Sequence, residues 1–407
     1  MSALFRSYLC GRKAAEWLIN MKRIVAVLGM AVISVGAFFG LSKLAGTMDQ
    51  PKGFDPATVP DVVEYAAGMP ADTVIATVDG QSVLAGDLCY WMSYAADMVE
   101  YLYQIQGQEI DWSMDMEGTS LAERVKEQSL ESVKLYRLLE TKAGELDCGL
   151  TAGQEEQLKQ ARAGLAEQQG GENELKKWML QVCLTEGTLD RINRVTLLYQ
   201  NILETEADGA PADAAEMAEY IAANDLLRAK HILLSTKNLS TMEELSDEEK
   251  AAKKAKAEEI LAQLRESGDP VTLFDELMQE YSEDTGLALN PDGYDFTAGD
   301  MVAEFEAATR ALDYGEISGI VESSFGYHII LRLDPADEAL AAQIGADRGQ
   351  EKMDALVAGW MEEAVVETTE AYDKMDPAAF HENMTALRQE IELADAEAAE
   401  PAPSAAQ

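Results

Sequence analysis

The sequence predicts an α+β protein, in which a β–α module is inserted in a mostly α-helical chain that one transmembrane helix precedes. Three observations support this prediction. An uncharged run fills residues 24–41, apolar residues recur at helical spacing through most of residues 87–206, and two β-type runs frame residues 228–335. The chain has 407 residues, which is enough for more than one domain with a sizeable core.

Charge is unevenly distributed along the chain. Residues 1–23, a predicted cytoplasmic segment, are basic, whereas the whole chain has a formal net charge of −42. Residues 24–41 would form a helix about 27 Å long, close to the hydrocarbon thickness of a bilayer. Basic residues before such a helix favour a cytoplasmic N-terminus. We therefore expect a single-pass protein of the cell membrane, with the lipid bilayer as partner of residues 24–41 and the bulk of the chain extracytoplasmic.

A cleaved signal peptide is the alternative to this uncleaved signal anchor, and Met21 is an alternative start. Lys43 and Leu44 stand where a signal-peptide cleavage site needs a small residue, which favours the anchor. No Cys directly follows the apolar run, so the sequence there does not form a lipoprotein cleavage and lipidation site.

The acidic composition argues against nucleic acid as a partner, because phosphate binding needs clustered Lys and Arg. It indicates a soluble surface rather than an acidic metal-binding role. Three of the four cysteines, Cys89, Cys148 and Cys183, would be extracytoplasmic, an odd number that permits at most one internal bridge. We expect them to be small buried residues.

Elements of the first helical part follow a predicted linker at residues 42–72. The run "TVIATVDGQSV" predicts two short strands joined at Asp79-Gly80, a strong hairpin-turn pair. Asp87 is placed to cap the next helix. The predicted apolar face of that helix consists of Trp91, Tyr94, Ala95, Met98 and Leu102. Further helices are predicted at about 120–145, 151–168, 171–183 and 186–206, so residues 73–224 form the first helical part.

The pattern of predicted elements changes at residue 225. A compact module begins there, with the order β, α, α, loop, α, β. Ser246 and Glu249 predict a capping box for its first helix. A plain turn explains Asn290–Gly293 better than a calcium loop, because the alternating acids and distal Glu are missing. The other predicted elements are the strand "RAKHILLS", a second helix around Phe274–Tyr281, a third with Met301, Phe305, Ala308 and Leu312 on one stripe, and the closing strand "SSFGYHIILRL".

Residues 336–388 predict another helical part, which we expect to pack back on residues 73–224 and so make the module at 225–335 an insertion. The final residues, 389–407, are rich in Ala, Pro and Glu and are predicted to be a disordered tail.

Two of the three histidines lie in the framing strands of the module. His231 is near its start and His328 near its end, and adjacent strands would bring them side by side. A lone histidine of this kind is usually a core residue satisfied by a neighbour, but a pair favours a functional site. Neither has the spacing of a metal site, and no Ser or Cys nucleophile motif accompanies them, so we expect no metal and no cofactor.

Taken together, "RAKHILLS", "YSEDTG" and "FTAGDMVAEFEAATRALDYGEISGIVESSFGYHIILRL" resemble the parvulin family of peptidyl-prolyl cis/trans isomerases over residues 228–335. The resemblance implies a parvulin-type β-α-α-α-β-β domain with an antiparallel or mixed sheet. The surrounding plan, an anchor, a helical region, this module and a returning helix, looks like that of PrsA/SurA-type extracytoplasmic foldases. That wider resemblance implies a chaperone-like helical domain around the module.

Carried over by position, the resemblance implies the site residues. The facing histidine pair falls on His231 and His328, the Cys-or-Asp position on Asp284, and the hydroxyl that joins the network on Ser323. The proline pocket falls on Met301 and Phe305, with Phe296 in the same cleft. The implied reaction needs no bond to the enzyme, because binding the twisted X–Pro amide better than the planar one is sufficient.

Two departures from the family pattern matter. Residues 235–249 hold a single Lys237 amid acids, so specificity for phospho-Ser-Pro is not expected. The family's Gly-Asp-Leu-Gly run is Pro291-Asp292-Gly293-Tyr294 here, so one wall of the pocket differs.

The expected partners are unfolded or partly folded exported polypeptides with X–Pro bonds. A holdase chaperone with an inert module is the first alternative, and an envelope scaffold the second. Aromatic residues of the helical part could line a cradle for unfolded chains or simply pack between helices: Tyr90, Trp91, Tyr94, Tyr101, Tyr103 and Trp112. The sequence leaves the oligomeric state open, a homodimer included.

Overall fold

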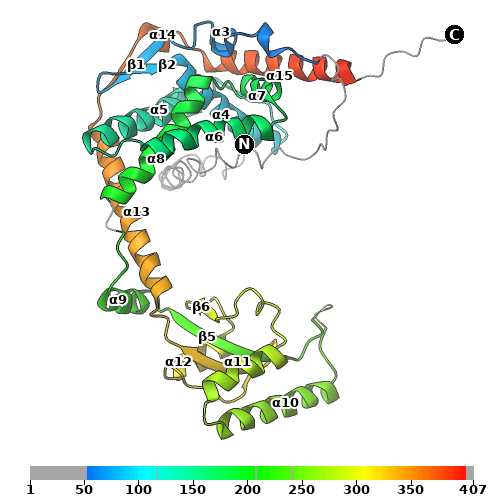
Figure 1. Ribbon diagram of the computed structural model, residues 1–407. Coiled ribbons are helices and arrows are strands. Elements are labelled where there is room, and N and C mark those ends of the chain that lie inside the picture. Colours follow the sequence, from blue (N-terminus) through cyan, green and yellow to red (C-terminus); the bar gives the residue numbers. More distant parts are fainter. Residues whose placement is uncertain (1–52, 117, 207–208, 240, 242, 400–407) are drawn as a thin grey trace, which may run out of the picture. The chain divides into compact units, whose positions relative to one another are not determined.

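The computed structural model describes residues 53–399 except 117, 207, 208, 240 and 242, and it divides into two compact units (Figure 1). The first unit contains the described residues up to 206 and from 352 on, and the second contains residues 209–351. The predicted cytoplasmic segment and anchor, residues 1–41, lie outside the described residues. Among the helices of the described part, none is both long and apolar enough to cross a bilayer.

Helices dominate the first unit. Its three-stranded sheet has the order β2-β1-β9, and a separate hairpin pairs β3 with β4. Asp79 and Gly80 both have positive φ at the β1–β2 turn, as this hairpin type requires. The elements are η2 (Pro56–Thr58), α3 (Val62–Ala67), β1 (Val74–Val78), β2 (Gln81–Leu84), α4 (Ala85–Gln104), β3 (Asp115–Met116), β4 (Thr119–Ser120), α5 (Leu121–Glu145), α6 (Ala152–Gln168), α7 (Glu172–Gln181), α8 (Glu186–Glu206), β9 (Val366–Thr368), α14 (Glu370–Asp373) and α15 (Pro377–Ala399).

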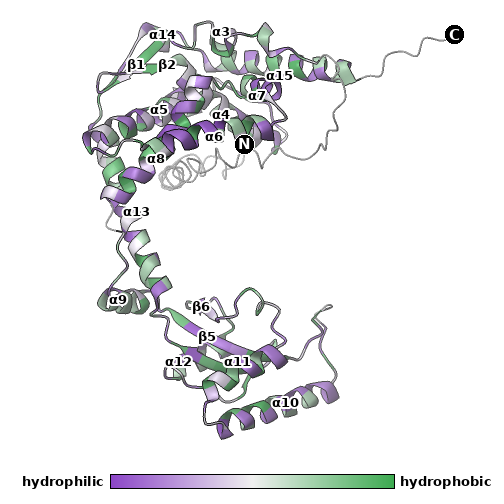
Figure 2. Cartoon of the chain, viewed as in Figure 1, coloured by the Kyte–Doolittle hydropathy of each residue, from purple (hydrophilic) through white to green (hydrophobic). Residues whose placement is uncertain are grey.

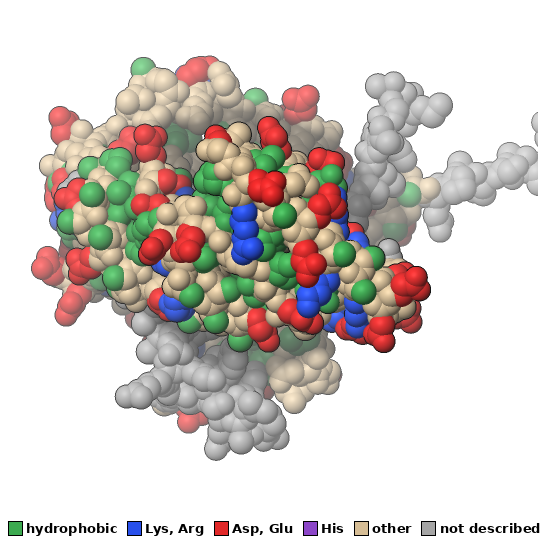
Figure 3. Space-filling view, turned by 90° about the horizontal axis from the view of Figure 1, so that it is seen from below, with side chains coloured by type: hydrophobic (Ala, Val, Ile, Leu, Met, Phe, Trp, Pro, Cys, Tyr) green, Lys and Arg blue, Asp and Glu red, His purple; other side chains and the backbone are tan. Residues whose placement is uncertain are grey.

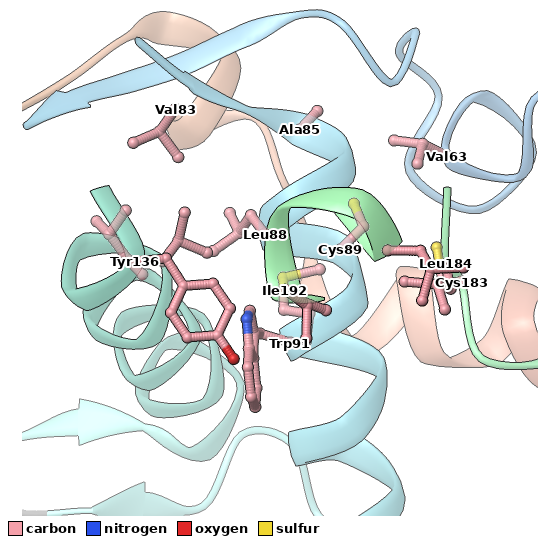
Figure 4. Close-up of a cluster of buried hydrophobic side chains, with 14 of the residues drawn as sticks. Val63, Val83, Ala85, Leu88, Cys89, Trp91, Tyr136, Cys183, Leu184 and Ile192 are labelled. Carbon is pink, nitrogen blue, oxygen red and sulfur yellow. The ribbon is translucent and has the colours of Figure 1, made fainter. Parts of the chain in front are cut away.

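The core of the first unit lies between α4, α5 and α8. Leu88 and Trp91 of α4, Tyr136 of α5 and Ile192 of α8 turn toward one another there (Figure 4). The rings of Trp91 and Tyr136 meet edge to face, with centroids 5.6 Å apart. Cys89, Cys148 and Cys183 are buried and unbridged, as the sequence predicts.

The packed face of α4 differs from the predicted one. Met92 and Ala96 are buried, whereas Tyr94, Met98 and Leu102 are exposed. Because apolar residues occur all around this helix, its periodicity does not decide which side packs.

The described residues of two segments that were expected to be irregular include helices. Within the predicted linker, Asp61 caps α3, and Val62 and Val63 are buried against the first unit. The predicted disordered tail is helical up to Ala399, and Asp395 in this stretch accepts the backbone N–H of Phe54 at 2.9 Å. The two segments therefore stabilise each other.

Asp87 is not the cap of α4. The helix begins at Ala85, with Leu84 as its N-cap, and the Asp87 side chain is buried. Its carboxylate accepts hydrogen bonds from Arg191 at 2.6 Å, Arg137 at 3.3 Å and Thr188 at 3.0 Å. An ion network therefore joins α4, α5 and α8 inside the unit.

The second unit is built on a four-stranded sheet of order β6-β5-β8-β7, in which every pair is antiparallel. The order along the chain is β-α-α-β-α-β-β, so the loop expected after the second helix contains a strand, β6, that pairs with β5. The elements are α9 (Ala214–Asn224), β5 (Leu227–Ser235), α10 (Asp247–Glu266), α11 (Pro270–Tyr281), β6 (Tyr294–Phe296), α12 (Ala303–Ala311), β7 (Val321–Glu322), β8 (Gly326–Leu333) and the beginning of α13 (Glu338–Glu363).

Helices cover both faces of this sheet. Helices α10 and α11 pack on the face that carries Ile232 and Ile329, whereas Phe305 of α12 packs on the face that carries Ile330. The capping box of Ser246 and Glu249 is present. Hydrophilic and hydrophobic colours alternate along α10, as expected of a helix with one apolar side (Figure 2). On the face shown in Figure 3, basic side chains are interspersed with acidic ones.

Candidate active site

Strand register brings the two histidines together. His231 on β5 lies opposite Ile330 on β8, and His328 lies opposite Leu233. The two histidines are therefore diagonal neighbours, and because side chains alternate along a strand they share the face covered by α12. Their rings are nearly parallel, and the two Nδ1 atoms are 3.0 Å apart.

A single chain of hydrogen bonds extends from these rings in both directions. Asp284 Oδ2 lies 3.0 Å from His231 Nε2, and Ser323 Oγ lies 2.7 Å from His328 Nε2. A carboxylate only accepts, so His231 donates from Nε2 and, as a neutral imidazole, accepts at Nδ1. His328 then donates from Nδ1 and accepts at Nε2 from the Ser323 hydroxyl. One set of tautomers satisfies every bond of the network.

Asp284 lies just after α11 and receives three hydrogen bonds. Besides His231, the backbone N–H of Gly286 donates to Oδ1 at 3.0 Å and the Tyr294 hydroxyl donates to Oδ2 at 2.5 Å. Burial alone would raise the pKa of this carboxyl. The donors outweigh it and hold the pKa of Asp284 well below its usual range. The group is ionised throughout the physiological range.

His328 is the most buried member of the network. Burial, together with the neighbouring His231, lowers the pKa of His328 to about 4, although Asp284 acts in the opposite direction. His328 is therefore neutral at pH 7. An imidazole with so low a pKa is a poor general base at neutral pH, so the Ser323–His328 pair is ill suited to acyl transfer.

An apolar cluster lies against the imidazoles. Phe305 meets both rings edge to face, with centroids 5.2 Å from that of His231 and 5.5 Å from that of His328. Phe296 lies behind Phe305 at 5.7 Å, and both phenylalanines are buried. Met301 precedes α12 and is half-buried beside them. The structure thus brings all seven predicted site residues into one region.

Parts of this region are open to solvent. A cavity of about 430 Å³ in the second unit lies elsewhere, beside α10, where Lys237 and Glu283 are among its lining residues. The apolar cluster reaches solvent through Met301, and Asp284 keeps 17% of its side chain exposed.

Tyr294 is a site residue that sequence reasoning missed. The departure at Pro291–Tyr294 marks an altered pocket wall, but the sequence gives no sign that the new phenol reaches Asp284. The sequence offers one signal for this role, which is that a residue with a hydroxyl, Tyr294, stands where the family pattern has Gly.

Comparison with known proteins agrees with this geometry. The model of the PPIC-type PPIase domain, a rotamase, matches residues 231–334. These residues are a parvulin-type rotamase domain. The match includes both histidines, Asp284 and the whole apolar cluster.

Curated relatives are similar to part of this chain. The chain is similar to the foldase protein PrsA of Staphylococcus aureus (strain MRSA252), with 32% identity over 174 residues, 42% of this chain and 50% of that protein. The chain thus spans about half the length of the curated relatives that it matches.

Solved structures are also similar to this chain. PrsA from Bacillus subtilis is 20% identical, covering 78% of this chain and 93% of that one with a TM-score of 0.24. NmPin, the parvulin of Nitrosopumilus maritimus, is 31% identical, covering 27% and 96% with a TM-score of 0.20.

Proposed function

We propose that this protein is a membrane-anchored peptidyl-prolyl cis/trans isomerase that assists the folding of exported polypeptides. The observation that carries the proposal is the fixed imidazole pair beneath Phe305, beside an ionised Asp284. Binding an X–Pro segment requires an apolar side chain next to a rigid polar network, because the prolyl ring is apolar and the amide that precedes it is polar.

The proposed mechanism is non-covalent. Rotation about an X–Pro bond crosses a barrier near 18–20 kcal/mol because it breaks amide resonance. Met301 and Phe305 hold the prolyl ring, with Phe296 packed behind Phe305, while the network presents fixed dipoles to the amide as it twists. About 5–7 kcal/mol of preferential binding to the twisted form would accelerate the exchange 10⁴–10⁵-fold.

In this mechanism the histidines have a structural role and position the polar groups of the site. His231 and His328 hold each other in one tautomer, Ser323 fixes the far nitrogen, and Asp284 supplies the negative charge. None of them attacks the substrate. The floor of the site stays rigid because every ring nitrogen has a partner.

The first test measures catalysis directly on the full chain with a short X–Pro peptide, which is too small to benefit from chaperoning. Met301→Ala should lower kcat/KM about tenfold, because it removes roughly the contact free energy of one methionine side chain. His231→Ala should lower kcat/KM further, since it also disconnects Asp284 from His328.

Tyr314→Ala is the matched control, because Tyr314 is an exposed aromatic residue of the same unit outside the apolar cluster. It should leave kcat/KM unchanged. No acceleration by the wild-type protein, or equal kcat/KM for the wild type and both site variants, would refute the proposal.

A holdase is the second candidate function, and one observation favours it. Helix α4 and its C-cap expose an apolar stripe, the α4 stripe, that consists of Tyr94, Met98, Tyr101, Leu102 and Ile105. Exposed apolar surface of this kind can bind unfolded chains. By contrast, Trp91 and Tyr103 are buried, so they belong to the core rather than to a cradle.

The holdase is tested with a proline-free client that aggregates on dilution from denaturant. If the α4 stripe binds unfolded chains, Tyr101→Ser with Ile105→Ser should reduce the suppression of aggregation about fivefold, since about 1 kcal/mol of contact is removed. Leu289→Ser, a change at an exposed leucine in the other unit, serves as control. Equal suppression by the stripe variant and the control would argue against the stripe.

A further inference from the structure

The position of Tyr294 depends on a close approach of two strands. Tyr294 begins β6 and pairs with Ala229 of β5. The preceding Gly293 has φ of +103°, and a Cβ on it would lie 2.8 Å from the Ala229 carbonyl oxygen. Only glycine fits there without strain. Gly293 therefore allows Tyr294 to enter the sheet at the point where its ring faces His231 edge to face, at 5.8 Å.

A second glycine leaves room for the hydroxyl. A Cβ on Gly286 would lie 2.3 Å from Tyr294 Oη but 3.4 Å from Cζ. The backbone N–H of Gly286 meanwhile donates to Asp284 Oδ1. Asp284 is thus held on one oxygen by Gly286 and on the other by His231 and Tyr294.

We propose that Tyr294 is a positioning residue of this site, whose hydroxyl fixes the rotation of the Asp284 carboxylate and, through it, the tautomers of both histidines. Its consequence for catalysis rests on the proposed function. The run Pro291–Tyr294, which departs from the family pattern, then supplies a support for the network in addition to changing the pocket wall.

The physical reason lies in the geometry of Oδ2. Without Tyr294, each oxygen of Asp284 would have one donor, the Gly286 N–H on Oδ1 and His231 on Oδ2, so the two oxygens would be alike in their number of donors. The Tyr294 hydroxyl adds a second donor from another strand at 2.5 Å, a short, charge-assisted bond. Two donors on Oδ2 and one on Oδ1 leave a single orientation in which all three bonds are made. That orientation keeps the Nε2–H of His231 bound and its Nδ1 free to accept from His328.

The test is a double-mutant cycle on the full chain. Tyr294→Phe removes the hydroxyl, and Gly286→Ala displaces it by crowding. Each single variant should lower kcat/KM about three- to tenfold. The double variant should be no worse than either single variant. Once the hydroxyl is gone, the Cβ added at Gly286 lies 3.4 Å from the ring carbon Cζ, which is an ordinary contact. Tyr314→Phe, at an exposed tyrosine of the same unit, is the control and should change nothing.

A second readout does not depend on turnover. In the wild type the imidazole ¹⁵N resonances of His231 and His328 should each report one tautomer. In Tyr294→Phe they should move toward averaged values. Unchanged ¹⁵N resonances in Tyr294→Phe, or additive effects in the cycle, would overturn the proposal. If the wild type shows no catalysis, the proposed function fails, while the ¹⁵N measurement still decides the role of Tyr294.

Discussion

Asp87→Ala is expected to lower the free energy of unfolding of the first unit by about 3–5 kcal/mol. The Asp87 carboxylate lies between the guanidinium groups of Arg137 and Arg191, which are themselves mostly buried. Removing the carboxylate leaves two positive charges close together with Glu140 as their remaining acid. A buried charge without its partner is far more costly than the pair was stabilising. Chemical denaturation followed by tryptophan fluorescence measures the loss.

Asp190→Ala is the matched control on the same helix as Arg191. Asp190 pairs with Arg194 at the surface, where 55% of its side chain is exposed, so its loss should cost at most about 1 kcal/mol. If Asp87→Ala costs no more than Asp190→Ala, the arginines reach water after the substitution and the network does not stabilise the unit.

Local patterns explain why much of the fold could be predicted. Helix ends in the first unit follow from caps and breaks that are close in sequence, such as Thr151 before α6. The histidine pair could be predicted because two β-type runs frame one module, and pairing of these strands places the two histidines on one face.

What the sequence could not predict depends on distant contacts. Phe54 and Asp395 are joined across nearly the whole described chain, so composition alone made both of their segments look irregular. Strand β6 has three residues, too few for a periodicity to be visible. Tyr294 was missed for the same reason, since its partner Asp284 is reached only once β6 has paired with β5.

Acidification is expected to destabilise the second unit well before its carboxylates are protonated. The pKa of His328 is about 4 in the folded protein and near 6.5 when exposed. Between these values the unfolded chain binds the proton and the folded one does not, so the stability contribution is complete above pH 6.5 and is lost as the pH falls to 4. The loss amounts to about 3 kcal/mol. Asp284, whose pKa is also depressed, adds a further loss only below its own unfolded value, about 3.9.

Hydrogen exchange of the β5 and β8 amides reports this loss for the second unit alone, because opening is measured residue by residue. The matched variant is His328→Gln, which cannot take up a proton. Its stability at pH 7 should be lower than that of the wild type, since the bonds to His231 and Ser323 are weakened. Its free energy of opening should nevertheless change little between pH 6.5 and 5, whereas that of the wild type falls. Parallel pH dependences in the two proteins would mean that His328 takes up its proton while folded. The assignment of neutral tautomers to the histidine network, and the rigidity that we infer from it, would then be wrong.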